Sequence, residues 1–177
     1  MRQLLLLRHA KSSWDEAMLS DHARPLNTRG QVAAAVMADQ MRELGLVPDV
    51  VLVSSSRRTL QTLEALQPIE GPPIVEVMDA LYLAPWPRLM EAVRAVPQTA
   101  RSVLVIGHNP GLHEFGLALM GPAGAAMGGL HARRLAEGYP TGALAEFTVA
   151  ASWELITEGG GRLVRFLAPR DLPEVAS

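Results

Sequence analysis

The chain has 177 residues, 49% of them hydrophobic and 19% charged, with a formal net charge of −2. This length fits one globular domain spanning residues 1–177, and the composition excludes a disordered chain. The small negative charge argues against nucleic acid or an anionic membrane as the main partner. The absence of cysteine excludes disulfides, cysteine-based zinc sites and a cysteine nucleophile.

No stretch of the sequence approaches the length of a membrane-spanning segment. The leucine run at residues 4–7 is too short for a signal peptide, and it ends at Arg8 without a cleavage site. We therefore expect a cytoplasmic protein.

The first predicted element is a buried strand over that leucine run, and it ends abruptly at Arg8 and His9. A short, continuously apolar run is typical of a parallel sheet, and ligands bind beyond the carboxyl ends of such strands. A guanidinium can hold phosphate, and a neutral imidazole can act as a nucleophile. Taken alone, the pair is equally compatible with a strand that simply leaves the core at a charged residue.

Residues 10–26 show neither helical nor strand periodicity, and a loop of this length is usually functional or mobile. A helix with an apolar stripe that includes Val32 is predicted over residues 28–44. Asn27 or Thr28 can cap this helix, and Gly45 ends it.

A second buried strand at residues 49–54 leads into a serine-capped helix that ends near Leu66. The free backbone N–H groups of such a helix start attract anions. Arg57 and Arg58 in the first turn oppose the helix dipole, which is unfavourable unless an anion lies nearby. A pair of solvated arginines is the simpler alternative for this segment alone.

The rest of the chain continues the alternation of strands and helices, which predicts an α/β fold. Strands are expected at residues 74–77, 102–106, 146–150 and 163–167, and helices at residues 87–96, 112–120 and 131–135. The third strong buried strand ends at His108 and Asn109. Residues 121–129 are rich in glycine and should be mobile, and residues 169–177 should form a tail.

Three buried strands are thus each followed by groups that suit a phosphate, namely Arg8 and His9, then Ser54 to Arg58, then His108 and Asn109. A parallel sheet would bring all three ends to one edge. Phosphoryl transfer requires a nucleophile and several fixed cations or donors around the oxygens. Nearby arginines should lower the pKa of His9 and keep it neutral, and a cationic His108 would add charge stabilisation.

Together these segments resemble the histidine phosphatase superfamily, and within it the SixA-type phosphohistidine phosphatase branch. The matching segments are residues 7–14, 20–21, 24–26, Gly30, 58–62, 107–110 and 139–143. The resemblance covers nearly the whole chain and implies a three-layer α/β/α fold with a mainly parallel central sheet, as in phosphoglycerate mutase. It also implies that His9 becomes transiently phosphorylated while Arg8, Arg58 and His108 hold the phosphoryl oxygens.

The general acid is less well defined by the resemblance. Larger relatives carry a glutamate after the third strand, and Asp79 lies near that place, although a turn or capping role is an equal alternative. Phosphohistidine needs little help from an acid, because imidazole leaves more readily than an alkoxide. Further substrate contacts are expected from Lys11, Ser12, Ser54 and Asn109. No cofactor is expected, since no His and Asp cluster has the spacing of metal ligands.

The expected function is that of a metal-independent phosphatase. It would act through His9 and dephosphorylate phosphohistidine on a partner, such as a signalling protein. The short segment between Asp79 and His108 leaves no room for the capping insertion of sugar-phosphate mutases, which predicts an open, shallow site. The alternative is a phosphatase of small esters such as sugar or nucleotide phosphates. A non-catalytic phosphate-binding module is a further alternative from a different class.

Overall fold

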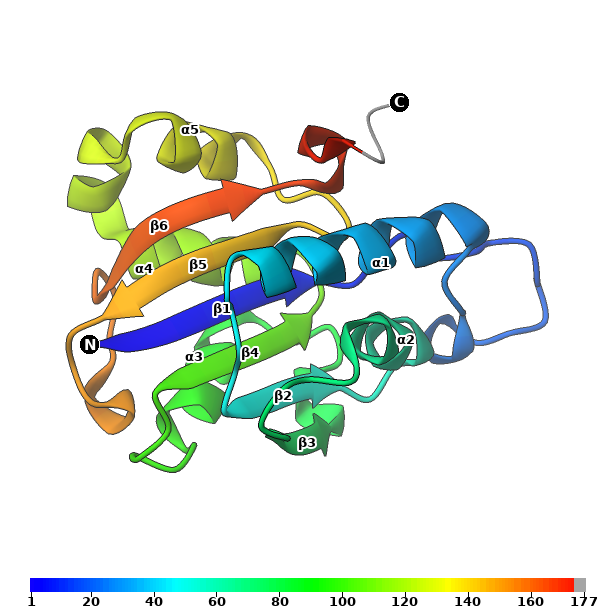
Figure 1. Cartoon of the computed structure of the whole chain (residues 1–177), viewed down its shortest axis with the longest axis horizontal. Helices are drawn as coiled ribbons and strands as arrows, with labels where there is room; N and C mark the ends of the chain where they lie inside the picture. The colour runs from blue at the N-terminus through cyan, green and yellow to red at the C-terminus, as the bar shows by residue number, and fades with distance from the viewer. Residues whose placement is uncertain (174–177) are drawn as a thin grey trace.

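The computed structural model describes residues 1–173 and contains a six-stranded sheet in the order β3-β2-β4-β1-β5-β6 (Figure 1). The strands are β1 (Arg2–Arg8), β2 (Val50–Ser54), β3 (Ile74–Met78), β4 (Ser102–Gly107), β5 (Leu144–Val149) and β6 (Gly161–Leu167). Strands β3, β2, β4 and β1 are parallel, whereas β5 and β6 pair in antiparallel fashion. The predicted mainly parallel sheet is confirmed.

Helices cover both faces of this sheet, with α1 and α2 in front and α3 and α4 behind in Figure 1. The helices are α1 (Thr28–Glu43), α2 (Arg57–Leu66), α3 (Trp86–Arg94), α4 (Gly111–Met127) and α5 (Gly129–Glu137). The three-layer α/β/α architecture is therefore confirmed. Within residues 1–173, no helix is both long and apolar enough to cross a membrane.

The leucine run of β1 is continuous because both faces of the strand are buried. Leu4 and Leu6 pack in the core beneath α3, α4 and α5, while Leu5 and Leu7 pack beneath α1 and α2. Full burial of each leucine contributes about 1.5–3 kcal/mol. This packing holds the carboxyl end of β1, and with it His9, at a fixed place on the sheet edge.

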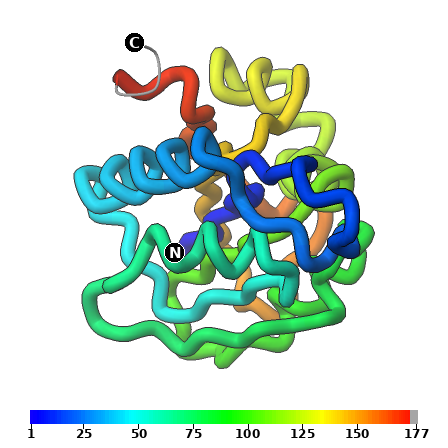
Figure 2. The backbone as a smooth tube through the Cα atoms, turned by 90° about the vertical axis from the view of Figure 1, so that its right-hand side faces the viewer, coloured from blue at the N-terminus to red at the C-terminus, as the bar shows by residue number. Residues whose placement is uncertain are grey.

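The loop that follows β1 is tied down at both of its ends. The Lys11 carbonyl accepts a hydrogen bond from the Asn27 N–H at 3.0 Å, and Ser12 forms a β-bridge with Leu26. Gly30 allows this close approach, because a Cβ atom there would overlap the Lys11 carbonyl. In Figure 2 this blue segment lies at the front, on the side toward which the parallel strands of Figure 1 point.

Three local expectations differ from the structure. Val32 is 51% exposed, because the buried face of α1 is instead formed by Gly30, Ala34, Val36, Met37, Ala38 and Met41. Residues 121–127 belong to α4, which breaks at Gly121 (φ 65°) and then resumes, so the helix continues beyond the end predicted at residue 120. The predicted tail begins with a 3-10 turn at Pro169–Asp171, and Leu172 is buried against the α1 and α2 layer, whereas residues 174–177 lie outside the described residues.

Candidate active site

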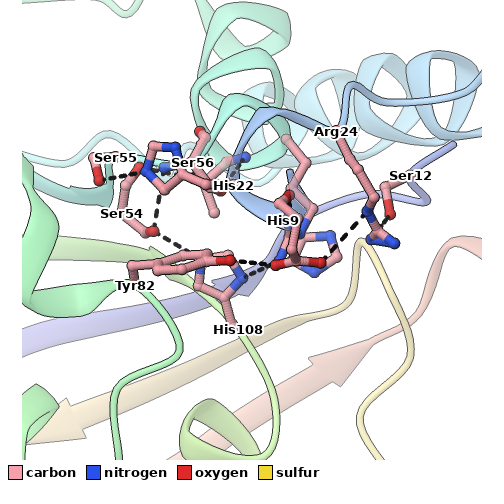
Figure 3. Close-up of polar contacts among 12 residues, drawn as sticks. His9, Ser12, His22, Arg24, Ser54, Ser55, Ser56, Tyr82 and His108 are labelled. Atoms are coloured by element: carbon pink, nitrogen blue, oxygen red, sulfur yellow. Dashed lines mark hydrogen bonds and ion pairs between the residues drawn. The ribbon is translucent and has the colours of Figure 1, made fainter. Parts of the chain in front are cut away.

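The carboxyl ends of β1, β2 and β4 lie next to one another, and the residues that follow them surround one cleft of about 460 Å³ (Figure 3). The cleft is lined by Arg8, His9, Arg58 and His108, the four residues expected to act together. The imidazole centroids of His9 and His108 are 5.3 Å apart. Arg58 Nη2 lies 3.4 Å from His108 Nδ1, and Arg8 lines the same cleft, so the structure brings the four expected residues together.

The His9 ring is held in a single tautomer by its own loop. Its Nδ1 lies 2.7 Å from the Ala10 carbonyl oxygen, and because a carbonyl can only accept, Nδ1 carries the proton. The lone pair is therefore on Nε2. Burial, followed by the positive charges of Arg58, Arg8 and Arg24, lowers the pKa of His9 to about 4. The imidazole is neutral at pH 7, as nucleophilic attack requires.

Burial keeps the His108 ring neutral at pH 7 as well. Its Nε2 lies 2.7 Å from the Ser54 hydroxyl oxygen, and the ring is 2% exposed. Burial is the largest cause that lowers the pKa of His108 to about 3, and His9 and Arg58 add to it. The sequence alone does not reveal this burial, which depends on residues from several elements of the fold.

The two arginines present donors that have no protein partner. Arg8 Nη1 donates to the Tyr139 carbonyl at 2.9 Å, and Arg58 Nη1 donates to the Asp21 carbonyl at 2.7 Å. Within residues 1–173, the buried Nε atoms of both guanidiniums lack a hydrogen-bond partner. Both guanidiniums line the cleft, so their positive charge makes it suited to an oxygen-rich anion. Arg57 is exposed and does not line the cleft, whereas Arg58, which the resemblance names as a phosphoryl contact, does.

The further substrate contacts expected from the sequence are only partly brought to the cleft. Lys11, Ser12 and Asn109 line it, and the buried Asn109 Oδ1 has no partner among the described residues. Ser54 does not line it, because Ser54 is fully buried and its hydroxyl bonds to His108. Ser54 therefore positions the His108 ring rather than contacting a substrate.

Asp79 also lies outside the residues that line the cleft. Its side chain is exposed in the 3-10 segment Asp79–Leu81, and its backbone carbonyl accepts the Tyr82 N–H at 3.0 Å. The geometry supports the turn-forming alternative for Asp79 and not the general acid. The acidic residue at the cleft is Asp21, which belongs to the loop after β1.

Sequence reasoning missed a second group of residues around the cleft. Asp21 Oδ2 accepts hydrogen bonds from the Tyr82 hydroxyl and from Arg58 Nη2, the latter at 2.9 Å. Asp21 Oδ1 lies 3.5 Å from Arg24 Nε, and the Arg24 guanidinium carbon lies 3.3 Å from the centre of the exposed Trp14 ring. In the sequence, Asp21 and Arg24 stand out only as part of the segments that resemble the family. The pattern that could have indicated their contact is a pair of opposite charges three residues apart in a long loop.

Among residues 1–173, no group of three or more His, Asp or Glu side chains is arranged to hold a metal ion.

Comparisons with known proteins agree with the geometry. Residues 4–92 match the family model of the histidine phosphatase superfamily, branch 1. An uncharacterised Mycobacterium tuberculosis protein is 32% identical over 166 residues, which cover 93% of this chain and 100% of that protein. A chloroplastic Arabidopsis thaliana protein is 47% identical over 66 residues, but the match spans only 30% of that longer protein.

Solved structures give the same family. SixA from Nakamurella multipartitia superposes with a TM-score of 0.82 at 29% identity, over 95% of this chain and 96% of that chain. The protein histidine phosphatase SixA complexed with tungstate superposes with a TM-score of 0.75 at 27% identity, over 96% of this chain and 98% of that chain. The chain therefore belongs to the histidine phosphatase superfamily and is of the SixA type.

Proposed function

We propose that this protein is a phosphohistidine phosphatase, which moves a phosphoryl group from a partner protein to His9 and then to water. The observation that carries the proposal is the His9 tautomer: Nδ1–H is held by the Ala10 carbonyl, so that Nε2 is free to attack. The ring shares a cleft with Arg8 and Arg58, whose unpaired buried donors suit phosphoryl oxygens.

In the first step, His9 Nε2 forms a bond to phosphorus as the P–N bond of the substrate breaks. The electron pair of that bond goes to the leaving imidazole nitrogen. Arg8 and Arg58 hold the phosphoryl oxygens throughout. The incoming anion raises the pKa of His108, since a nearby negative charge favours the protonated ring, so His108 can then donate a hydrogen bond to the phosphoryl group.

In the second step, water attacks the phosphorus of phosphorylated His9. The P–N bond breaks, its electron pair returns to Nε2, and dihydrogen phosphate leaves. His9 is then neutral again, and its Nδ1–H still donates a hydrogen bond to the Ala10 carbonyl oxygen. In the first step His9 replaces the substrate imidazole at phosphorus, and in the second step water replaces His9. Neither step requires a strong acid or base.

The open mouth of the cleft supports a protein substrate. Only α3 separates the 3-10 segment Asp79–Leu81 from β4, and α3 packs into the core on the other side of the sheet from α1. The cleft is thus not capped by an inserted helical region, and a phosphorylated side chain on a folded partner can approach it. The similarity to a protein histidine phosphatase at 27% identity supports the same substrate class.

A substrate comparison with the full chain tests this proposal. A histidine-phosphorylated phosphotransfer protein, a sugar phosphate and a nucleotide phosphate are offered separately, and phosphate release is measured. We expect kcat/KM to be highest for the phosphorylated protein. His9→Ala should lower it about 10³-fold or more, because the nucleophile is lost.

The covalent intermediate gives a second readout. Turnover of ³²P-labelled substrate is stopped under alkaline denaturing conditions, in which a P–N bond survives, and label on the protein is measured. Label should appear on the wild-type chain and be absent from His9→Ala. Preferential hydrolysis of the small esters would replace the proposed substrate class, and undiminished hydrolysis by His9→Ala would refute the role of His9.

A further inference from the structure

The cleft contains one carboxylate that the proposed mechanism does not use. Among the described residues that line the cleft, Asp21 is the only acidic one. Its side chain is 44% exposed, whereas the Arg58 and Arg24 side chains that it contacts are 4% and 9% exposed. Asp21 therefore lies on the solvent side of the two arginines, at the mouth of the cleft.

Three groups fix the Asp21 carboxylate in this place. Arg58 Nη2 donates to Oδ2 at 2.9 Å, the Tyr82 hydroxyl donates to the same oxygen, and Arg24 Nε lies 3.5 Å from Oδ1. In the view of Figure 3, Tyr82 and Arg24 lie on opposite sides of His9, and Asp21 contacts both. These contacts from three directions hold the carboxylate at the edge of the cleft that also contains His9.

Asp21 is not suited to be a proton donor. The hydrogen bond from Tyr82, and then the contact with Arg58, hold the pKa of Asp21 below its usual value, so that the group is ionised at pH 7. A carboxylate also repels a phosphoryl dianion, so it does not serve a site whose only task is to bind phosphate. Its remaining capacity is to accept a hydrogen bond or to face a positive charge.

We propose that Asp21 accepts a hydrogen bond from the leaving imidazole of phosphohistidine and thereby makes the site selective for P–N over P–O substrates. This inference rests on the proposed function. The imidazole that carries the phosphoryl group has a second ring nitrogen, which can hold a proton. An anion at the mouth of the cleft favours that protonated, cationic form.

The proton on the second nitrogen decides which species leaves. When it is present, cleavage places the electron pair of the P–N bond on the nitrogen that held phosphorus, and a neutral imidazole departs. When it is absent, the same cleavage would release an imidazolate anion, a much stronger base. No proton has to move during the step if Asp21 keeps this nitrogen protonated. A phosphate ester has no such proton, so Asp21 gives its cleavage no help.

The attacking ring and the departing ring then each donate a hydrogen bond from the second ring nitrogen to an oxygen atom of this chain. The Nδ1–H of His9 donates to the Ala10 carbonyl, and the corresponding N–H of the substrate ring donates to the Asp21 carboxylate. Tyr82 and Arg24 act as positioning residues for Asp21. The Tyr82 ring also packs edge-on against His108, with the ring centroids 5.3 Å apart, and so connects the mouth of the cleft to its interior.

The test is Asp21→Asn, which keeps the shape of the side chain and removes its charge. We expect kcat/KM for the histidine-phosphorylated protein to fall about 10- to 100-fold, the range for losing a hydrogen bond to a charged group. For p-nitrophenyl phosphate, whose leaving group needs no acid, the change should stay within about threefold. Tungstate, as a probe of the phosphoryl site, should bind the variant as tightly or more tightly, because a like charge is removed.

Asp79→Asn is the matched control, since Asp79 is exposed and outside the cleft, and it should change none of the three measurements. Tyr82→Phe retains the carboxylate and removes one of its donors, so it should show a smaller loss with the same bias toward the P–N substrate. If Asp21→Asn instead lowers both activities equally and weakens tungstate binding, Asp21 only holds Arg58 in place. If Asp21→Asn changes nothing, the proposal is equally wrong.

Failure of the proposed function is visible in a different measurement. A wild-type chain that does not hydrolyse the phosphorylated protein refutes that function, and the role of Asp21 falls with it. A wild-type chain that does hydrolyse it, while Asp21→Asn retains full activity, refutes only the role of Asp21.

Discussion

The floor and the rim of the cleft are built in different ways. The floor (Arg8, His9, Arg58 and His108) directly follows buried strands of the sheet or begins the helix after one, and its two histidines are 6% and 2% exposed. The rim (Trp14, Asp21, Arg24 and Tyr82) comes from the loop after β1 and the turn after β3, and Trp14 is 78% exposed. In the function that we propose, the floor would meet the phosphoryl group and the rim would meet the rest of the substrate.

The largest expected effect separates two neighbouring arginines of the α2 start. Arg58 is 3% exposed and lines the cleft, whereas Arg57 is exposed and lies outside it. Arg58→Ala removes a donor for the phosphoryl oxygens and should lower kcat/KM about 10²- to 10³-fold. Arg57→Ala should change it less than about twofold. Steady-state kinetics on the same substrate, with circular dichroism to verify folding, measures the difference.

Comparable losses in the two arginine variants would contradict the assignment of Arg58 to the floor. Such a result would mean that the helix start contributes general positive charge and not a directed hydrogen bond. Repeating the assay at high salt would then distinguish the two cases, because exposed charges are screened more strongly than buried ones.

The floor could be predicted from the sequence because each of its residues follows a pattern visible in the sequence. The strand that ends at His9 and the strand that ends before His108 are continuous apolar runs, and parallel strands place their ends at one edge. The serine cap of α2 is followed by both Arg57 and Arg58, and only the resemblance to the family singled out Arg58. No knowledge of side-chain packing was needed to bring these three together.

The rim could not be predicted in this way, because its contacts join distant positions without any local pattern. Asp21 contacts Arg58 and Tyr82, which lie 37 and 61 positions further along the chain. Of the two alternatives for Asp79, the structure favours the turn-forming one, because Asp79 lies close to Tyr82 in sequence but outside the cleft. The neutral His108 was missed because its pKa depends on burial by residues from several elements.

A second prediction concerns the contact between Gly30 of α1 and the loop after β1, which carries most of the rim residues. Gly30 lies in the first turn of α1 directly against the Lys11 carbonyl, so Gly30→Ala would force the loop after β1 away from the helix. We expect the free energy of unfolding to fall by about 1–3 kcal/mol, as for other overpacked sites. Gly138→Ala is the control, because nothing lies within 4 Å of the position its Cβ would take. Chemical denaturation measures both variants.

Gly30→Ala also shows whether the position of the rim residues depends on the contact between their loop and α1. A displaced loop carries Asp21 with it, so Gly30→Ala should lose activity on the histidine-phosphorylated protein more than on p-nitrophenyl phosphate. A Gly30→Ala chain as stable as Gly138→Ala would show that the loop can shift freely, and that its position against α1 does not hold the rim.

The smallest expected effect is on the pH dependence of stability. The folded chain lowers the pKa of His9 to about 4 and that of His108 to about 3, against about 6.5 in an unfolded chain. Below pH 6.5 the unfolded state therefore binds more protons than the folded state, and the free energy of unfolding falls as the pH drops toward 4. Above about pH 7.5 neither ring contributes to the slope, because both states are then deprotonated.

Replacing one ring isolates its contribution. His108→Gln removes a titrating group of the floor, so between pH 7.5 and 5.5 its free energy of unfolding should fall less than that of the wild type, by on the order of 1 kcal/mol. Only the slopes are compared, because the variant also loses the hydrogen bond to Ser54 at every pH. NMR titration of the ring protons gives the same information directly, with midpoints well below 6.5 expected for both histidines. Equal slopes, or midpoints near 6.5, would mean that the floor is open to water and no more protected than the rim.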